Sequence, residues 1–204
     1  MRKKFAASSD RALVQIVDVA LADVTQRAGK WLACGRGCTQ CCIGVFSINQ
    51  LDVWRLRKGL AELERNDPKR AARLRDRARD AVRRLSADFP GDPESGLLDE
   101  GEEAERQFFE FANQEACPVL DPETGDCELY EWRPMTCRVF GPPVPTEGGL
   151  GMCELCFQGA TNEEISACEL RPDPEDLESK LVRQVERASG VQGNTIVPFG
   201  LTVG

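Results

Sequence analysis

The feature that most constrains this sequence is a run of four cysteines within nine residues, in the segment C-G-R-G-C-T-Q-C-C. They are Cys34, Cys38, Cys41 and Cys42. Two intervening residues let a tight loop place two sulfurs around one metal at about 2.3 Å. Gly35 and Gly37 permit the positive backbone angles that such a loop requires. The run therefore predicts coordination of a metal by thiolates.

Six further cysteines follow in wider spacing. Cys117 and Cys127 flank the turn sequence D-P-E-T-G-D, which predicts two short extended segments bearing these residues. Cys137 and the pair Cys153 and Cys156 complete the expected ligands, whereas Cys168 stands alone and is interpreted as an ordinary thiol. The predicted metal ligands are Cys34, Cys38, Cys41, Cys42, Cys117, Cys127, Cys137, Cys153 and Cys156.

The N-terminal segment indicates a reducing compartment. Its apolar stretch from Leu13 to Val24 is interrupted by Asp18 and Asp23, so no signal peptide or membrane-spanning helix is expected. We therefore predict a cytoplasmic protein. Ten cysteines in a reducing environment favour metal ligands over disulfides.

The chain contains no histidine. This excludes Cys-His and Ser-His-Asp catalytic sites, and it excludes mixed Cys/His zinc sites. Sulfur must then supply most of the coordination, and soft thiolate donors select zinc or an iron–sulfur cluster, including a four-iron cluster. The sequence leaves the choice between these open.

The hydrophobic pattern predicts a mainly α fold with short irregular or β segments, in a small single domain stapled by thiolate metal sites. Amphipathic helices are expected over 9–32, after a Ser47–Gln50 capping box, from Asp67 to near Pro90, over 104–113, and from Asp173 to Gly190. The domain is expected to span 1–204, with a metal-binding core over 34–138, further cysteines from 153–168 and an extended tail over 191–204.

Charge is distributed unevenly along a chain of net charge -8. Residues 69–84 carry eight basic groups, and residues 92–105 carry seven acidic ones. We expect the two runs to neutralise each other across a helical hairpin or to be solvated, an anionic partner being the alternative. The acidic total argues against binding to nucleic acid or to anionic membranes, and it leaves any protein partner unknown.

The cysteine motifs resemble those of a known family, the YkgJ-type cysteine-cluster proteins or CxxCxxCC zinc- or iron-chelating domain. One motif is the Cys-Cys-ended cluster, with three residues after Cys34 where the family name implies two. The other is C-P-V-L-D followed by C-E-L-Y-E-W-R-P-M-T-C-R, which matches C-x-x-Y-x-x-R-P-x-x-C-R from Cys127 to Arg138. The resemblance implies thiolate binding of a metal, and a related domain occurs in a flagellin lysine N-methylase.

Residues beside the cysteines have two interpretations. Arg36, Arg133 and Arg138 would offset the excess negative charge of a thiolate site, or would form surface salt bridges. Tyr130, the only tyrosine, is expected to pack beneath the site.

Three functions compete. The first is a non-catalytic metal-binding protein, with two centres because nine thiolates exceed the four that one zinc or one cluster takes. The second is an iron–sulfur enzyme that modifies protein; the spacing Cys34-x3-Cys38-x2-Cys41 also occurs in radical S-adenosylmethionine enzymes, but the alternating strands and helices of their barrel are not predicted here. The third is a thiol oxidoreductase based on Cys153-x2-Cys156.

Overall fold

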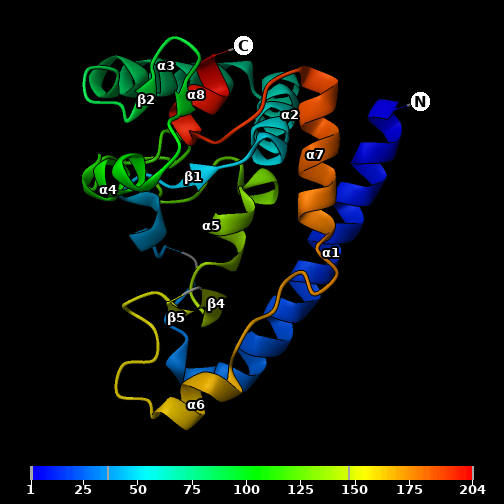
Figure 1. The fold of residues 1–204 in the computed structure, drawn as a ribbon, viewed down its shortest axis with the longest axis vertical. Coiled ribbons are helices and arrows are strands. Elements are labelled where there is room, and N and C mark those ends of the chain that lie inside the picture. The colour runs from blue at the N-terminus through cyan, green and yellow to red at the C-terminus, as the bar shows by residue number, and fades with distance from the viewer. Residues whose placement is uncertain (1, 36, 147, 204) are drawn as a thin grey trace. The chain divides into compact units, whose positions relative to one another are not determined.

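Helices dominate the structure, a computed structural model that describes residues 2–35, 37–146 and 148–203. The described strands form three short antiparallel pairs: β1 with β6, β2 with β3, and β4 with β5. The mainly α class with short β segments is therefore confirmed (Figure 1). Among the described helices, none is both long enough and apolar enough to cross a membrane.

The chain forms two compact units, each built from segments that are separate in sequence. Unit 1 comprises Met1–Arg36 and Thr136–Ala188, and unit 2 comprises Gly37–Met135 and Ser189–Gly204. The boundary falls inside the first cysteine run, between Cys34 and Cys38. That the whole chain acts as one domain stays a prediction.

Unit 1 is built largely from helices around a small core that contains thiols. Its elements are α1 (Arg2–Ala28), a 3-10 helix (Gly29–Trp31), α5 (Met135–Val139), the β4–β5 hairpin (Val144–Thr146 and Gly149–Gly151), α6 (Asn162–Ala167) and α7 (Leu177–Ser189). Val24, Ala28, Phe157 and Leu170 pack there with three buried cysteines. The backbone N–H of Phe157 donates to the carbonyl of Trp31 at 2.7 Å, which ties the later segment to the end of α1.

Unit 2 is built around three helices that pack against one another, α2, α3 and α8. Figure 1 shows α8, in red, against α2 and α3. The elements are a 3-10 helix (Gln40–Cys42), β1 (Ser47–Ile48), α2 (Gln50–Asn66), α3 (Pro68–Leu85), β2 (Gly91–Asp92), β3 (Leu97–Leu98), α4 (Glu102–Glu110), a 3-10 helix (Tyr130–Trp132), β6 (Thr195–Ile196) and α8 (Val197–Thr202).

The two central helices differ in how well the sequence predicted their starts. The side chain of Asp67 accepts the N–H of Arg70 and Pro68 opens α3, as expected. The prediction of a Ser47–Gln50 capping box is wrong, because the side chain of Asn49 caps α2 by accepting hydrogen bonds from the N–H groups of Leu51 and Asp52. Ser47 instead lies in β1, paired with Ile196.

The extended tail predicted over 191–204 is wrong. Residues 195 and 196 pair with β1, and Pro198 then starts α8. Phe199 is only 1% exposed and stacks on Phe89 with ring centroids 4.4 Å apart. The segment folds back because its apolar side chains fill the space between helices, which a short sequence pattern does not show.

Proline and glycine predict loops over 89–101 and 141–151, but each stretch contains a hairpin. Gly91 pairs with Leu98, and a Cβ at Gly91 would lie 2.1 Å from the carbonyl oxygen of Leu97. Val144 pairs with Gly151 in the second hairpin. Backbone pairing, which proline and glycine content does not reveal, forms both hairpins.

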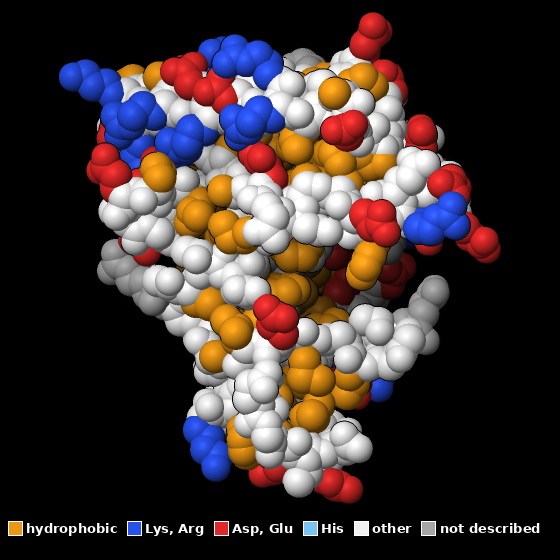
Figure 2. Space-filling model, turned by 90° about the vertical axis from the view of Figure 1, so that its left-hand side faces the viewer, with side chains coloured by type: hydrophobic (Ala, Val, Ile, Leu, Met, Phe, Trp, Pro, Cys, Tyr) orange, Lys and Arg blue, Asp and Glu red, His pale blue; other side chains and the backbone are white. Residues whose placement is uncertain are grey.

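The basic run on α3 has partners other than those predicted. Its arginines pair with acids that all lie outside 92–105, namely Arg70 and Arg77 with Glu128, Arg75 with Glu64, Arg79 with Asp76, Arg83 with Asp80, and Arg84 with Glu115. Figure 2 shows Lys and Arg side chains with Asp and Glu among them on the upper part of the visible face. The run is neutralised, but by α2, by its own helix and by a later cysteine-bearing segment.

We expect Phe199→Ala to lower the free energy of unfolding by about 3–5 kcal/mol, because the ring is buried and the cavity would not refill. Urea unfolding measures this. The matched control is Phe109→Ala, since Phe109 is 82% exposed and its loss should cost less than about 0.5 kcal/mol. Equal effects of the two substitutions would contradict the structure of the C-terminal segment.

Candidate metal centre

The first cysteine run pairs with the segment that carries Cys117. The N–H of Cys117 donates to the carbonyl of Cys42 at 2.7 Å, and the N–H of Gly44 donates to the carbonyl of Glu115 at 2.8 Å. An antiparallel bridge between Ile43 and Ala116 lies between these bonds. Backbone pairing therefore brings residues 42 and 117 together although 74 positions separate them.

A tight turn then brings Cys127 back beside the same segment, as the sequence predicted. Leu120 and Cys127 form an antiparallel bridge, and the N–H of Glu128 donates to the carbonyl of Val119 at 2.9 Å. Gly125 closes the turn with φ 70, and its N–H donates to the carbonyl of Asp121. Cys117 and Cys127 both pack against the core of unit 2.

The thiols of Cys41 and Cys42 are hydrogen-bonded to each other. The shared hydrogen bond lowers the pKa of Cys41 to about 6 and raises the pKa of Cys42. The nearby charges of Cys117 and Cys127 also contribute to the raised pKa of Cys42. Consecutive residues usually point their side chains in different directions, but these two thiols lie together, and Cys42 also senses the charges of Cys117 and Cys127 in unit 2.

Burial has the largest effect on the pKa of the Cys117 thiol. It raises the pKa of this thiol to about 12, and the charge of Cys127 adds to the shift. Cys117 is therefore protonated at neutral pH in the absence of a cation. Binding of a metal would have to release that proton, so metal affinity should rise with pH.

Unit 1 contains a second pair of thiols. The sulfur of Cys34 lies 3.8 Å from that of Cys156, and it also faces the carbonyl oxygen of Phe140. Gly141 makes this position possible, because a Cβ there would lie 2.7 Å from the Cys34 sulfur. Nothing in the sequence singles out Gly141, whose positive φ of 132 is typical of glycine.

Three cysteines of unit 1 are buried in its apolar core. Cys153, Cys156 and Cys168 belong to one cluster with Val24 and Phe157. The N–H of Cys153 donates to the carbonyl of Gly141 at 3.2 Å, which places the C-E-L-C segment beside the glycine that adjoins Cys34. Cys168, interpreted from the sequence as an ordinary thiol, is thus grouped with two predicted ligands.

The remaining two predicted ligands are less closely grouped. Cys38 lies in unit 2 after Gly37, whose φ is 87, as the loop interpretation requires. Cys137 lies in α5 of unit 1 and is partly buried. That these two and the other seven predicted cysteines are metal ligands stays a prediction.

The available donors fit zinc or iron better than magnesium or calcium. All ten cysteines are thiols, without a disulfide among the described residues. No three Cys, Asp or Glu side chains converge at metal-binding spacing in the part of the chain that the structure describes. The sulfurs instead come in close pairs, and a separation of 3.8 Å is near the edge of a tetrahedron with metal–sulfur bonds of about 2.3 Å.

The residues expected to lie beside the thiolates differ in the contacts they make. Burial raises the pKa of Cys127, and the positive charge of Arg133 partly offsets that shift. The same charge adds to the lowering of the pKa of Cys41 by its hydrogen bond with Cys42, so Arg133 lies near both thiols. Arg138 forms a salt bridge with Asp18 at 2.7 Å. Tyr130 does not pack beneath the site, since it is 57% exposed with the Arg133 guanidinium stacked on its ring. Arg36 lies outside the described residues.

A buried ion pair that sequence reasoning missed holds the segment before Cys137. Asp52 and Arg55 on α2 pair at 2.6 Å, and both side chains are 2% exposed. The same oxygen of Asp52 accepts the N–H of Met135, the first residue of α5, at 2.9 Å. A signal was present in the i, i+3 spacing of the two residues, but that spacing is also common on exposed helix faces.

Comparison with known proteins supports a metal-binding role. The family model CxxCxxCC, "Putative zinc- or iron-chelating domain", matches residues 33–156. This match covers more than half of the chain, and the chain belongs to that family. Neither the curated proteins nor the solved structures contain a match.

We expect Asp52→Ala to lower the free energy of unfolding by about 3–5 kcal/mol, because it leaves the Arg55 charge buried without this carboxylate and frees the start of α5. Denaturant unfolding of the metal-loaded chain measures the loss. Asp76→Ala is the control, since Asp76 and Arg79 have the same i, i+3 spacing on an exposed face and should contribute no more than about 1 kcal/mol. A loss from Asp52→Ala no larger than that of the control would contradict this account.

Proposed function

We propose that this protein holds metal through thiolates at two centres, one in each unit. The observation that carries the proposal is that the thiols gather separately: Cys41, Cys42, Cys117 and Cys127 in unit 2, and Cys34 with Cys156 in unit 1. Family membership supports chelation of zinc or iron in general. The two-centre division is our own inference.

This division assigns Cys34 and Cys41 to different centres, whereas the sequence spacing favours Cys34, Cys38 and Cys41 at one of the two centres and Cys42 at the other. The spacing of Cys34 and Cys156 supports a centre in unit 1, to which Cys137 or Cys153 would add donors. Cys38 would add a donor to the centre of unit 2. Cys42, whose carbonyl accepts the N–H of Cys117, belongs to the second centre in this proposal.

Zinc and a four-iron cluster both suit a donor set without histidine. A reducing cytoplasm, which we propose as the location, would keep the ten cysteines reduced. Anaerobic purification followed by metal and sulfide analysis tests the identity. A colourless protein with stoichiometric zinc would exclude the cluster, and a brown protein with iron and acid-labile sulfide would exclude structural zinc.

The two centres predict that metal content falls in steps. Reconstituted with Zn²⁺ under reducing conditions, Cys42→Ala and Cys156→Ala should each lose about half of the metal, and the double variant nearly all, because each removes a donor from a four-ligand site. Metal analysis with thiol quantification measures this.

The control for this experiment is Cys168→Ala, which removes a buried thiol without placing a hydroxyl in the apolar core. It should keep the full metal content, because Cys168 is not one of the proposed donors. A wild-type chain that saturates with one mononuclear metal or one cluster would refute the two-centre model.

We also propose that the basic run on α3 is not a nucleic-acid site, a view supported by the ion pairs that engage six of its arginines. Fluorescence anisotropy with duplex and single-stranded oligonucleotides should give no binding at submicromolar protein. Binding that weakens steeply with added salt would show the opposite.

A further inference from the structure

Helix α3 packs against the segment that carries two of the proposed ligands. We name residues 115–128 the cysteine hairpin. Ala71 and Leu74 of α3 are fully buried in the same apolar cluster as Val119, and Cys117 and Cys127 pack against that cluster. The apolar face of α3 is therefore part of the cluster against which both cysteines pack.

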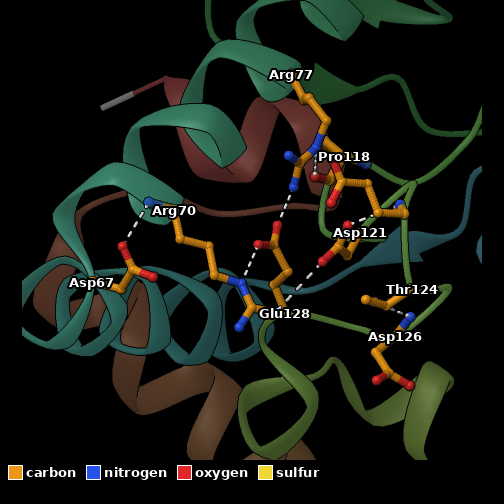
Figure 3. Close-up of polar contacts among 9 residues, drawn as sticks. Asp67, Arg70, Arg77, Pro118, Asp121, Thr124, Asp126 and Glu128 are labelled. Atoms are coloured by element: carbon orange, nitrogen blue, oxygen red, sulfur yellow. Dashed lines mark hydrogen bonds and ion pairs between the residues drawn. The ribbon is translucent and has the colours of Figure 1, made fainter.

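Two arginines of α3 form hydrogen bonds with residues of the cysteine hairpin. The Nε of Arg77 donates to the carbonyl oxygen of Pro118 at 2.9 Å, and its Nη2 binds the carboxylate of Glu128. The Nε of Arg70 binds the other carboxylate oxygen of Glu128. Figure 3 shows Glu128 between the two guanidinium groups.

These contacts reach residues directly beside the cysteines. Pro118 follows Cys117, and Glu128 follows Cys127, so one guanidinium group, that of Arg77, spans both arms of the hairpin. Arg70 also approaches Asp121 at 4.0 Å, and Arg84 binds Glu115. The Glu128 side chain is 2% exposed, so its charge depends on these partners rather than on water.

We propose that Arg77, Arg70 and Glu128 are positioning residues that fix the separation of Cys117 and Cys127 before a metal binds. This inference rests on the proposed function, in which both cysteines are ligands. The planar guanidinium of Arg77 can bind a carbonyl and a carboxylate at once, which a lysine ammonium on a flexible stem does not reproduce. Groups that orient metal ligands change metal affinity by about 10–100-fold when removed.

The same helix offers matched controls. Arg79 and Arg83 pair with Asp76 and Asp80, one turn earlier on α3, and their side chains are mostly exposed. Arg→Lys substitutions at positions 77 and 79 therefore change the same group on the same helix. They differ in whether the side chain contacts the cysteine hairpin.

The experiment uses the full reduced chain loaded with Co²⁺, whose thiolate charge-transfer absorption reports sulfur coordination. The part of the absorption that Cys117→Ser removes defines the signal of the relevant centre. Release of Co²⁺ to an added chelator is then followed in the wild type and in the Arg77→Lys, Glu128→Gln, Arg77→Lys/Glu128→Gln and Arg79→Lys variants. Far-UV circular dichroism confirms that each variant is folded.

We expect Arg77→Lys and Glu128→Gln to release Co²⁺ about tenfold faster than the wild type, with an altered absorption spectrum, and Arg79→Lys to match the wild type. The double variant should lose little more than either single one, because both substitutions disrupt one contact. Release by Arg77→Lys within twofold of the wild type would overturn the inference while leaving the proposed function intact. No change of absorption in Cys117→Ser would instead refute the ligand assignment itself.

Discussion

Glu128 carries a carboxylate that is almost completely withdrawn from water, and a charge in that position requires compensation. Arg70 and Arg77 provide it from α3. Because Glu128 adjoins Cys127, the pairing that compensates the charge also fixes where the hairpin lies on the helix. Loss of an arginine partner would leave the buried carboxylate of Glu128 poorly compensated, and this favours one register of the hairpin on α3.

The same requirement recurs at Asp52 and Arg55, whose buried pair binds the first N–H of α5. In both places an ion pair inside the protein fixes a backbone segment next to a cysteine in sequence. Backbone pairing of 42–44 with 115–117 adds a third constraint in unit 2. Thiols from distant positions are thus brought together by contacts made by their neighbours, and not by the sulfurs alone.

Several elements were predictable because their causes are local. Asp67-Pro68 starts α3, and the D-P-E-T-G-D turn joins the arms that bear Cys117 and Cys127. Other elements were missed because their causes are distant. Asn49 caps α2, while Ser47 pairs with Ile196. The C-terminal segment forms α8 because Phe199 packs against Phe89. Tyr130 was expected beneath the site, yet stacking with Arg133 leaves it exposed.

The sequence by itself determined the donor chemistry. Ten cysteines without histidine require that sulfur supply most of any coordination, and the motifs from Cys34 to Arg138 identify the zinc- or iron-chelating family. Only the tertiary structure decided which thiols are neighbours: Cys34 lies beside Cys156 in unit 1, while Cys41 and Cys42 lie near Cys117 and Cys127 in unit 2. The reason is physical. Residue type determines which ligands a side chain can bind, whereas side-chain packing and backbone pairing between distant segments determine which other side chains lie beside it.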